Sequence, residues 1–282
     1  MTVFGQTITE PFIIRDYYSF FNPAYTSYKS EIKASTYAKF RNPESISWNS
    51  NFEISIPNTN FSFGSNFHRD VIGQFEENYV SISAAYATNL KKGKLRIGLS
   101  SALMNRKLSG DWISAVGDVV DPSLYYLYPS PNISKQGRIF NSIGLAYFTK
   151  KYHVGFSIDN YQGLLVYGND VLNEKNLFIN ISGGGELIRR ETFDLEVDFF
   201  VRSGNERTSI RIVPTATIWS KFQVGLGHGI QDDVTPFVGY LFHFGKENPQ
   251  YLKLNFGTSI TTSRIRTGAS PDYFLNLGYY IN

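Results

Sequence analysis

The stretch "GLGHGIQDD" combines residue types that could do chemistry, since His228 precedes Asp232 and Asp233 by only a few positions. A histidine beside two carboxylates could act as a hydrolytic pair or hold a metal ion. A glycine-rich strand that ends in an acidic turn accounts for the same residues more simply. We favour the structural interpretation.

The four histidines give no stronger signal. His68, His153, His228 and His243 fall on four different predicted strands, without the i, i+4 helical spacing of a zinc site. The glycine-rich "GGGEL" at 183–187 is followed neither by a helix nor by Lys-Ser/Thr, so it is not a phosphate-binding loop. The sequence therefore predicts neither a metal site nor a nucleotide site at these positions.

Two acidic residues in "GDVVDPSLYY", Asp118 and Asp121, could contact a cation, but Asp and Asp-Pro are also common turn formers, and we favour a turn. The chain has no cysteine, which excludes disulfides, thiolate catalysis and Cys-ligated metals. We expect no catalytic residue, no metal and no cofactor, and hence no enzyme.

Composition favours strands over helices. Tyr and Phe number 19 and 23, Gly numbers 24, and charged residues make up only 18% of the chain, a mixture that suits pleated strands and tight turns. No apolar run approaches the roughly 20 residues of a membrane-spanning helix. A β-barrel remains compatible with the sequence because its strands are apolar on one face only. The net charge of +3 is too small to indicate a nucleic-acid partner.

Alternation of apolar and polar residues recurs along the chain. In "NFEISI" and "FDLEVDFFV" every second residue is apolar, so one strand face is apolar and the other polar. This pattern and the turn residues between the segments predict about fourteen strands. Their expected ranges are 31–40, 47–57, 60–68, 78–89, 94–104, 137–149, 151–160, 176–185, 192–202, 207–219, 221–230, 234–244, 250–262 and 272–281.

These strands predict an all-β fold, a transmembrane antiparallel β-barrel. The number is even and many segments are about 9 to 11 residues long, as a tilted membrane strand requires. Soluble sandwiches and lipocalin-like barrels also use alternating strands. Fourteen strands enclose a lumen too wide for side chains alone to fill, and the inner face is polar, so we favour the membrane barrel.

Connection lengths predict the orientation of the barrel. One rim has short links, where we place Lys91, Lys150 and Lys221 in the periplasm. The other rim has the longest links, expected at 69–77, 105–136, 161–175 and 263–271, with 105–136 and 161–175 outside the cell. Outer-membrane barrels have short periplasmic turns and longer external loops.

The N-terminal part precedes the alternating pattern. We expect residues 1–28 to form a lead-in or plug segment, with residues 1–5 as a signal-peptide remnant, and residues 29–282 to form the barrel. The segment contains "SFFNPAYTSYKS", in which Asn22 and Pro23 predict a rigid turn. Its aromatic residues could pack inside the barrel, bind a partner or cover the periplasmic mouth. We expect an occluded lumen, aided by an inward Phe200.

Several motifs together resemble the PorP/SprF family. They are "NPAY" at 22–25, "GKLRIGLSSAL" at 93–103, the glycine-rich "SIGLAYFTKKYHVGFSIDNY" at 142–161, "FVGYLF" at 237–242 and the terminal "LNLGYYIN". Thr26 and Ser27 follow the first motif where Ala-Gly is more common in the family, and the chain ends in Asn282 rather than an aromatic residue. These differences concern the subfamily and leave the expected fold unchanged.

The resemblance implies an outer-membrane barrel of the type IX secretion and gliding apparatus of Bacteroidota. It implies a non-enzymatic role in binding, exporting or anchoring a secreted adhesin, or another protein with a C-terminal sorting domain, or in binding periplasmic components of the apparatus. Outer-membrane lipid is then the surrounding medium. We assign partner binding to five residues of the lead-in: Phe21, Asn22, Pro23, Tyr25 and Tyr28. A passive or substrate-selective pore is the alternative, and a barrel hydrolase is the third class.

Overall fold

The computed structural model describes residues 14–42, 45–72, 75–108, 135–167, 170–204, 208–229, 233–245, 250–261 and 271–281. Three short helices come first: η1 (Ile14–Tyr17), α1 (Tyr18–Phe21) and η2 (Pro23–Tyr25). No helix in these ranges is both long and apolar enough to cross a membrane.

Fourteen strands follow the helices, one for each predicted segment. Their bounds are β1 (Ile32–Asn42), β2 (Ser45–Ser55), β3 (Phe61–Ile72), β4 (Phe75–Leu90), β5 (Gly93–Leu108), β6 (Lys135–Phe148), β7 (Tyr152–Tyr167), β8 (Asp170–Arg189), β9 (Phe193–Ser203), β10 (Thr208–Ile218), β11 (Phe222–Gly229), β12 (Asp233–Phe244), β13 (Gln250–Thr261) and β14 (Asp272–Ile281).

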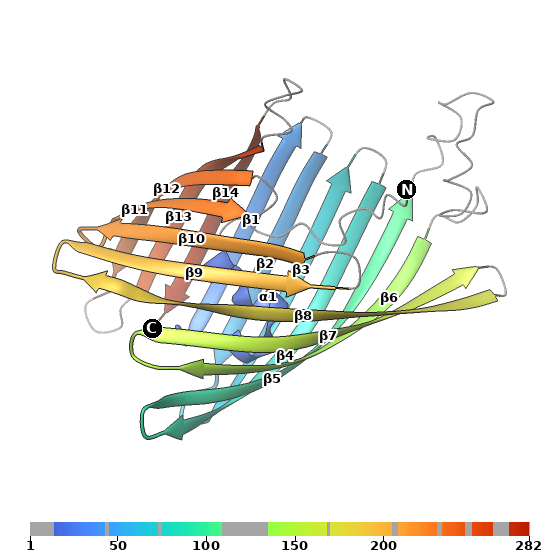
Figure 1. The fold of residues 1–282 in the computed structure, drawn as a ribbon, viewed down its shortest axis with the longest axis horizontal. Helices are drawn as coiled ribbons and strands as arrows, with labels where there is room; N and C mark the ends of the chain where they lie inside the picture. Colours follow the sequence, from blue (N-terminus) through green and yellow to red (C-terminus); the bar gives the residue numbers. More distant parts are fainter. Residues whose placement is uncertain are drawn as a thin grey trace.

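The strands form one closed antiparallel barrel. Each strand pairs with its neighbours in sequence, and β1 closes the sheet against β14, with Ala34 opposite Tyr279. Figure 1 shows the strands tilted around a lumen that holds the short helices. Closure pairs the backbone N–H and C=O groups of β1 and β14, which would otherwise form the open edges of the sheet. A sheet in lipid requires such pairing.

The polarity of the wall is the reverse of that in a soluble protein. On β2, the side chains of Ser47, Asn49 and Asn51 are buried in the lumen. The alternate residues on the same strand, Trp48 and Phe52, point outward and are 47% and 49% exposed. An apolar outer face around a polar interior is stable against hydrocarbon and not against water. This arrangement confirms the predicted membrane barrel and excludes the soluble sandwich.

Two of the predicted long loops are wrong. The expected loop at 69–77 is almost entirely strand, because β3 runs to Ile72 and β4 starts at Phe75. The expected loop at 161–175 is also strand, since β7 and β8 stay paired out to Tyr167 and Asp170. Alternating polarity ended earlier than the strands because a strand that continues beyond the bilayer no longer needs an apolar outer face.

The two rims still differ in the length of their links. Links of two to five residues join the strands at one rim, including 91–92, 149–151 and 219–221. The opposite rim carries the 26-residue link 109–134, which contains Asp118 and Asp121 and lies outside the described residues. We call these the turn rim and the loop rim. The expected loops at 105–136 and 263–271 fall mainly in undescribed ranges.

Candidate functional site

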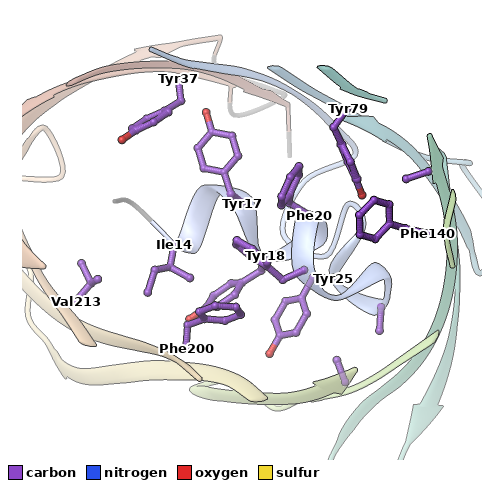
Figure 2. Packing of buried hydrophobic residues seen from close by; sticks show 14 of the residues in the cluster. Ile14, Tyr17, Tyr18, Phe20, Tyr25, Tyr37, Tyr79, Phe140, Phe200 and Val213 are labelled. Carbon is purple, nitrogen blue, oxygen red and sulfur yellow. The ribbon is translucent and has the colours of Figure 1, made fainter. Parts of the chain in front are cut away.

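The N-terminal segment occupies the barrel lumen. We call residues 14–30 the plug. Tyr17, Tyr18, Phe21 and Tyr25 have at most 2% of their surface exposed and join a cluster with aromatic residues of the wall. Figure 2 shows this packing in a view along the lumen. Of the arrangements that the sequence left open for the aromatic residues, the structure has them inside the barrel.

A hydrogen-bonded turn gives the plug its shape. The Asn22 side-chain oxygen accepts from the backbone N–H of Ala24 at 3.0 Å and thus caps the short helix η2. Pro23 occupies the first helical position, where its missing N–H costs nothing. The Thr26 hydroxyl donates to the Pro23 carbonyl at 2.8 Å. Sequence therefore dictates this turn locally, through Asn capping and the fixed φ of Pro.

Three wall glycines receive the turn. Gly98 on β5, Gly144 on β6 and Gly155 on β7 face the plug. A Cβ on Gly98 would overlap the plug backbone between Pro23 and Ala24, and a Cβ on Gly144 would overlap the Asn22 side chain. We call these three residues the glycine seat. Only a wall without side chains at these points lets the turn approach so closely.

Aromatic contacts hold the plug against other parts of the wall. Tyr17 meets Tyr37 of β1 edge to face at 5.9 Å between ring centroids. Phe21 lies 4.4 Å from Phe200 of β9, which confirms that Phe200 points inward. Phe20 contacts β3 and β4 in the same way. The plug is thus packed on opposite sides of the barrel at once.

A buried carboxylate anchors the start of the plug. Asp16 accepts hydrogen bonds from Lys253 of β13 at 3.1 Å, and from Asn276 and Tyr280 of β14 at 2.9 Å each. Burial alone would raise the pKa of this carboxyl, but the ammonium groups of Lys253 and Lys33 outweigh burial and lower the pKa below its ordinary value. Asp16 is therefore charged at neutral pH.

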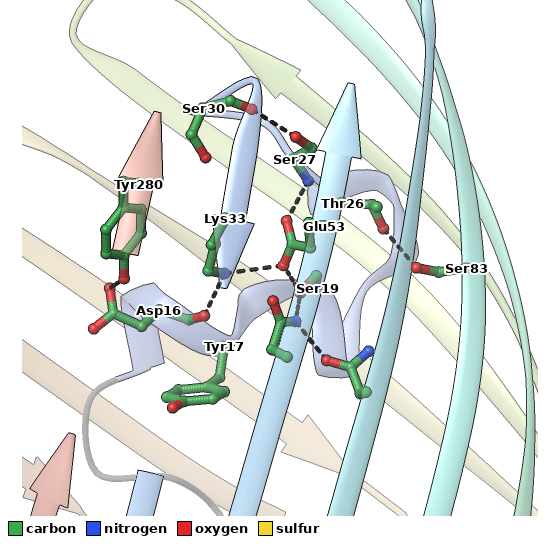
Figure 3. A network of polar contacts seen from close by, with 12 residues as sticks. Asp16, Tyr17, Ser19, Thr26, Ser27, Ser30, Lys33, Glu53, Ser83 and Tyr280 are labelled. Atoms are coloured by element: carbon green, nitrogen blue, oxygen red, sulfur yellow. Dashed lines mark hydrogen bonds and ion pairs between the residues drawn. The ribbon is translucent and has the colours of Figure 1, made fainter. Parts of the chain in front are cut away.

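A second carboxylate, Glu53 of β2, reaches the plug from the wall. It accepts from the Ser19 hydroxyl at 2.5 Å, from Lys33 at 2.9 Å and from the backbone N–H of Ser27. Figure 3 shows Asp16, Lys33 and Glu53 in one continuous network. Because Lys33 also donates to the Asp16 carbonyl, the network links both ends of the plug.

Arg96 of β5 fixes the exit of the plug. Its guanidinium donates to the backbone carbonyl of Thr26, to that of Ser27 at 3.4 Å and to the Ser62 hydroxyl at 2.9 Å. Arg15 of the plug forms an ion pair with Glu196 of β9. Charged groups held in this way are costly to leave unpaired in a buried site, so the plug and wall stabilise each other.

A Tyr–His–Asp chain resembles a catalytic arrangement in its residue types. The Tyr25 hydroxyl lies 3.1 Å from His153 Nδ1, and His153 Nε2 lies 3.5 Å from Asp198, which also accepts from Tyr18 at 3.1 Å. Tyr25 has no exposed surface, and the rings of Tyr28 and Phe148 cover His153. With no room for a substrate, these residues bind plug to wall.

The five residues predicted to bind a partner are brought together by the structure. Phe21, Asn22, Pro23 and Tyr25 are buried in the plug, and Tyr28 is partly buried beside Tyr25 and Phe148. In this conformation their contacts are with the barrel wall. A partner that depends on them therefore depends on the position of the whole plug.

Sequence reasoning missed the wall residues that hold the plug. Lys33, Glu53, Arg96, Asp198 and Lys253 are charged residues on the polar face of predicted strands. Their type was the available signal, because a charged residue that faces a lumen needs a partner. The glycine seat also gave a signal, because Gly144 and Gly155 both lie in the glycine-rich motif at 142–161.

A polar basin of about 230 Å³ opens beside the plug near the turn rim. The plug contributes Arg15, Tyr28 and Lys29, and the wall contributes Glu196 and Gln223 among others. The Lys29 side chain is 40% exposed and lies 4.0 Å from Glu196. The basin is the part of the plug surface that a molecule outside the barrel can reach.

The other candidate residues do not converge. His228 lies on the outer face of β11, and His243 bonds to the Ser220 carbonyl at 2.7 Å. His68 is buried against Phe20. Asp232 lies outside the described residues. Within the described ranges no three His, Cys, Asp or Glu side chains are grouped so that they could hold a metal ion.

Comparison with known families gives one match that spans the barrel. The model of the type IX secretion system membrane protein PorP/SprF matches residues 15–279. A comparison with curated proteins finds no match.

Solved structures resemble this one at low sequence identity. A Pseudomonas aeruginosa FadL homologue is 10% identical, with a TM-score of 0.52, and the match covers 93% of each chain. The CymD monoaromatic hydrocarbon channel is 12% identical, with a TM-score of 0.48, over 93% of this chain and 90% of its own. At such identity, the likeness to the FadL homologue bears on the fold alone.

Proposed function

Because this chain belongs to the PorP/SprF family of type IX secretion system membrane proteins and folds as a 14-stranded outer-membrane β-barrel, we propose that it is a plugged, non-enzymatic barrel that holds a partner protein. The partner is a secreted surface protein with a C-terminal sorting domain, such as an adhesin, or a periplasmic component of the secretion apparatus. The barrel binds it, assists its export or anchors it.

The observation that carries this proposal is the plug. An open pore needs a continuous aqueous lumen, whereas the lumen here contains a segment with aromatic contacts to several strands and a buried ion pair between Asp16 and Lys253 of β13. In this proposal the plug closes the path for solutes and presents a fixed surface. This supports a binding role over the passive pore.

A hydrolase is also disfavoured by the geometry. The chain of Tyr25, His153 and Asp198 between plug and wall lacks space for a substrate, as described above, and His228 lies on the outer face of β11. The proposal therefore assigns no step of chemistry to this barrel.

The accessible part of the plug lies in the basin at the turn rim, where Tyr28 and Lys29 meet the wall. We place this rim in the periplasm. A periplasmic component would then contact the basin, while Phe21, Asn22, Pro23 and Tyr25 act from beneath by fixing the plug. Their role in partner binding is indirect in this proposal.

Affinity purification of the tagged barrel from native envelopes, followed by mass spectrometry, tests the proposal. We expect a secreted protein with a C-terminal sorting domain or a type IX periplasmic component at near-stoichiometric yield. Planar-bilayer recordings of the intact chain complete the test. A barrel that recovers neither class of protein and conducts ions steadily through a large pore would contradict the proposal and favour the pore.

A further inference from the structure

Strand β8 is paired unequally on its two sides. Toward β7 its ladder runs from Tyr152 opposite Gly185 to Tyr167 opposite Asp170. Toward β9 the ladder begins only at Ile179 opposite Ser203. Among the described strands, none pairs with residues 170–178 on the β9 side. Figure 1 shows the β7–β8 hairpin projecting beyond the ends of β9 and β10.

This free edge must lie in water. Unpaired backbone N–H and C=O groups are too costly to place in hydrocarbon. The part of β8 with neighbours on both sides, residues 179–189, is long enough to cross the bilayer by itself, since a tilted strand needs about 9 to 11 residues. The nine residues beyond it continue for about 30 Å along the strand, on the loop-rim side of the membrane.

The register identifies which residues have their backbone groups on the open side. The N–H of Glu186 donates to Lys151 at 3.0 Å, so Glu186 faces β7. The β7–β8 ladder has no register shift, and in an antiparallel strand successive residues face alternate sides. The odd-numbered residues therefore direct N–H and C=O outward: Val171, Asn173, Lys175 and Leu177.

We propose that this free edge of β8 binds an extended segment of the secreted partner protein, which adds to the barrel wall as one further strand. An added strand would continue the β8–β9 ladder beyond Ser203 and satisfy the four open residues. The inference rests on the proposed function and specifies how the partner is held.

A second copy of this chain does not fit the edge. Two barrels in one membrane share the direction of the bilayer normal, so a two-fold axis that relates them runs along that normal. Both β8 strands then cross the membrane in the same direction, but they tilt to opposite sides. With a strand tilt of roughly 40°, the two edges cross at about 80° instead of running alongside each other. This geometry excludes a second copy, and the occupant that we assign is the secreted partner of the proposed function.

The test compares two double variants. Asn173→Pro with Lys175→Pro removes two outward N–H groups and keeps the ladder to β7, because proline is tolerated on an edge whose N–H faces solvent. Asn173→Ala with Lys175→Ala is the matched control, since it changes the same side chains and keeps both N–H groups. The probe is the purified C-terminal sorting domain of a secreted protein recovered with the wild-type barrel.

We expect the proline variant to recover at least tenfold less probe than wild type and the alanine variant to match wild type, with all three barrels heat-modifiable on gels. Equal recovery by wild type and the proline variant would overturn the edge proposal and leave the proposed function intact. Equal loss in both variants would assign binding to side chains and also overturn it. If affinity purification recovers no secreted protein with the wild-type barrel, this inference is overturned, and the proposed function then depends on a periplasmic component as the partner.

Discussion

Asn22 of the plug lies directly across Gly144 of β6, and its side-chain amide donates to the neighbouring Leu145 carbonyl at 3.2 Å. The two residues are far apart in sequence, in different motifs. Their contact explains why an Asn-Pro turn and a glycine-rich strand pair occur in one chain, because the turn fits only where the wall has no side chain.

Replacing Gly144 by valine is expected to displace the plug and leave the barrel folded. The added side chain would occupy the position of Asn22, while the backbone ladder of β6 stays intact. Limited proteolysis should then cleave within residues 14–30, and planar-bilayer conductance should rise above that of wild type. Leu145→Val, on the outer face of the same strand, is the control and should behave as wild type. An unchanged protease pattern in Gly144→Val would contradict the role that we assign to the glycine seat in holding the plug.

Asp16→Asn is expected to destabilise the protein by about 3 kcal/mol, because it leaves the buried Lys253 ammonium without its carboxylate. The measurement is the thermal midpoint of the refolded barrel in detergent. Asp194→Asn at the turn rim provides the control, since Asp194 Oδ1 has no hydrogen-bond partner, and its midpoint should stay near that of wild type. Equal thermal midpoints for Asp16→Asn and Asp194→Asn would contradict the stabilising role of Asp16.

The same carboxylate predicts a pH dependence of stability. Burial raises the pKa of Asp16, but Lys253 and Lys33 lower it by more, so the folded-state pKa lies below 3.8. The unfolded chain therefore takes up the proton more readily than the folded protein. The stabilisation is therefore present above about pH 4 and is lost as the pH falls through the lower folded pKa. The difference in thermal midpoint between wild type and Asp16→Asn should shrink on acidification. A difference that stays constant down to pH 2 would exclude this linkage.

Tyr25→Ala and Tyr25→Phe separate packing from hydrogen bonding. The alanine variant removes a fully buried ring and should cost about 3 kcal/mol or more. The phenylalanine variant loses only the hydroxyl contacts with His153 and with the Ser182 carbonyl and should cost about 1 kcal/mol. Both are read by thermal midpoint and by partner recovery from membranes with matched barrel levels. We expect partner recovery to fall in the alanine variant and to persist in the phenylalanine variant. Full recovery in the alanine variant would show that partner binding does not depend on the plug.

The orientation of the barrel is testable by single-cysteine labelling, because the chain contains no cysteine. Thr208→Cys lies at the loop rim and Lys150→Cys at the turn rim, and both positions are exposed. A membrane-impermeant maleimide should label Thr208→Cys on intact cells and Lys150→Cys only after permeabilisation. The reverse pattern would turn the barrel over and place the plug basin outside the cell.

The fourteen strands and the lipid around them follow from the pattern of residue types along the chain. Alternating polarity marked all fourteen segments, most to within about two residues, because lipid on one side and a polar lumen on the other impose a period of two on each strand. It failed at 161–175, where β7 and β8 continue into water and that demand ends. The Asn-Pro turn was also local information, set by two adjacent residues.

The position of the turn, and the residues that hold it, became known from the folded barrel. The contacts of Asn22 with Gly144 and of Asp16 with Lys253 join residues more than one hundred positions apart, and no local pattern encodes such a pairing. Barrel closure determines which polar wall residues face the plug, since each strand's tilt and register place its lumenal side chains at a particular depth. A charged residue in a predicted strand therefore signals a need for a partner, and the closed barrel supplies that partner.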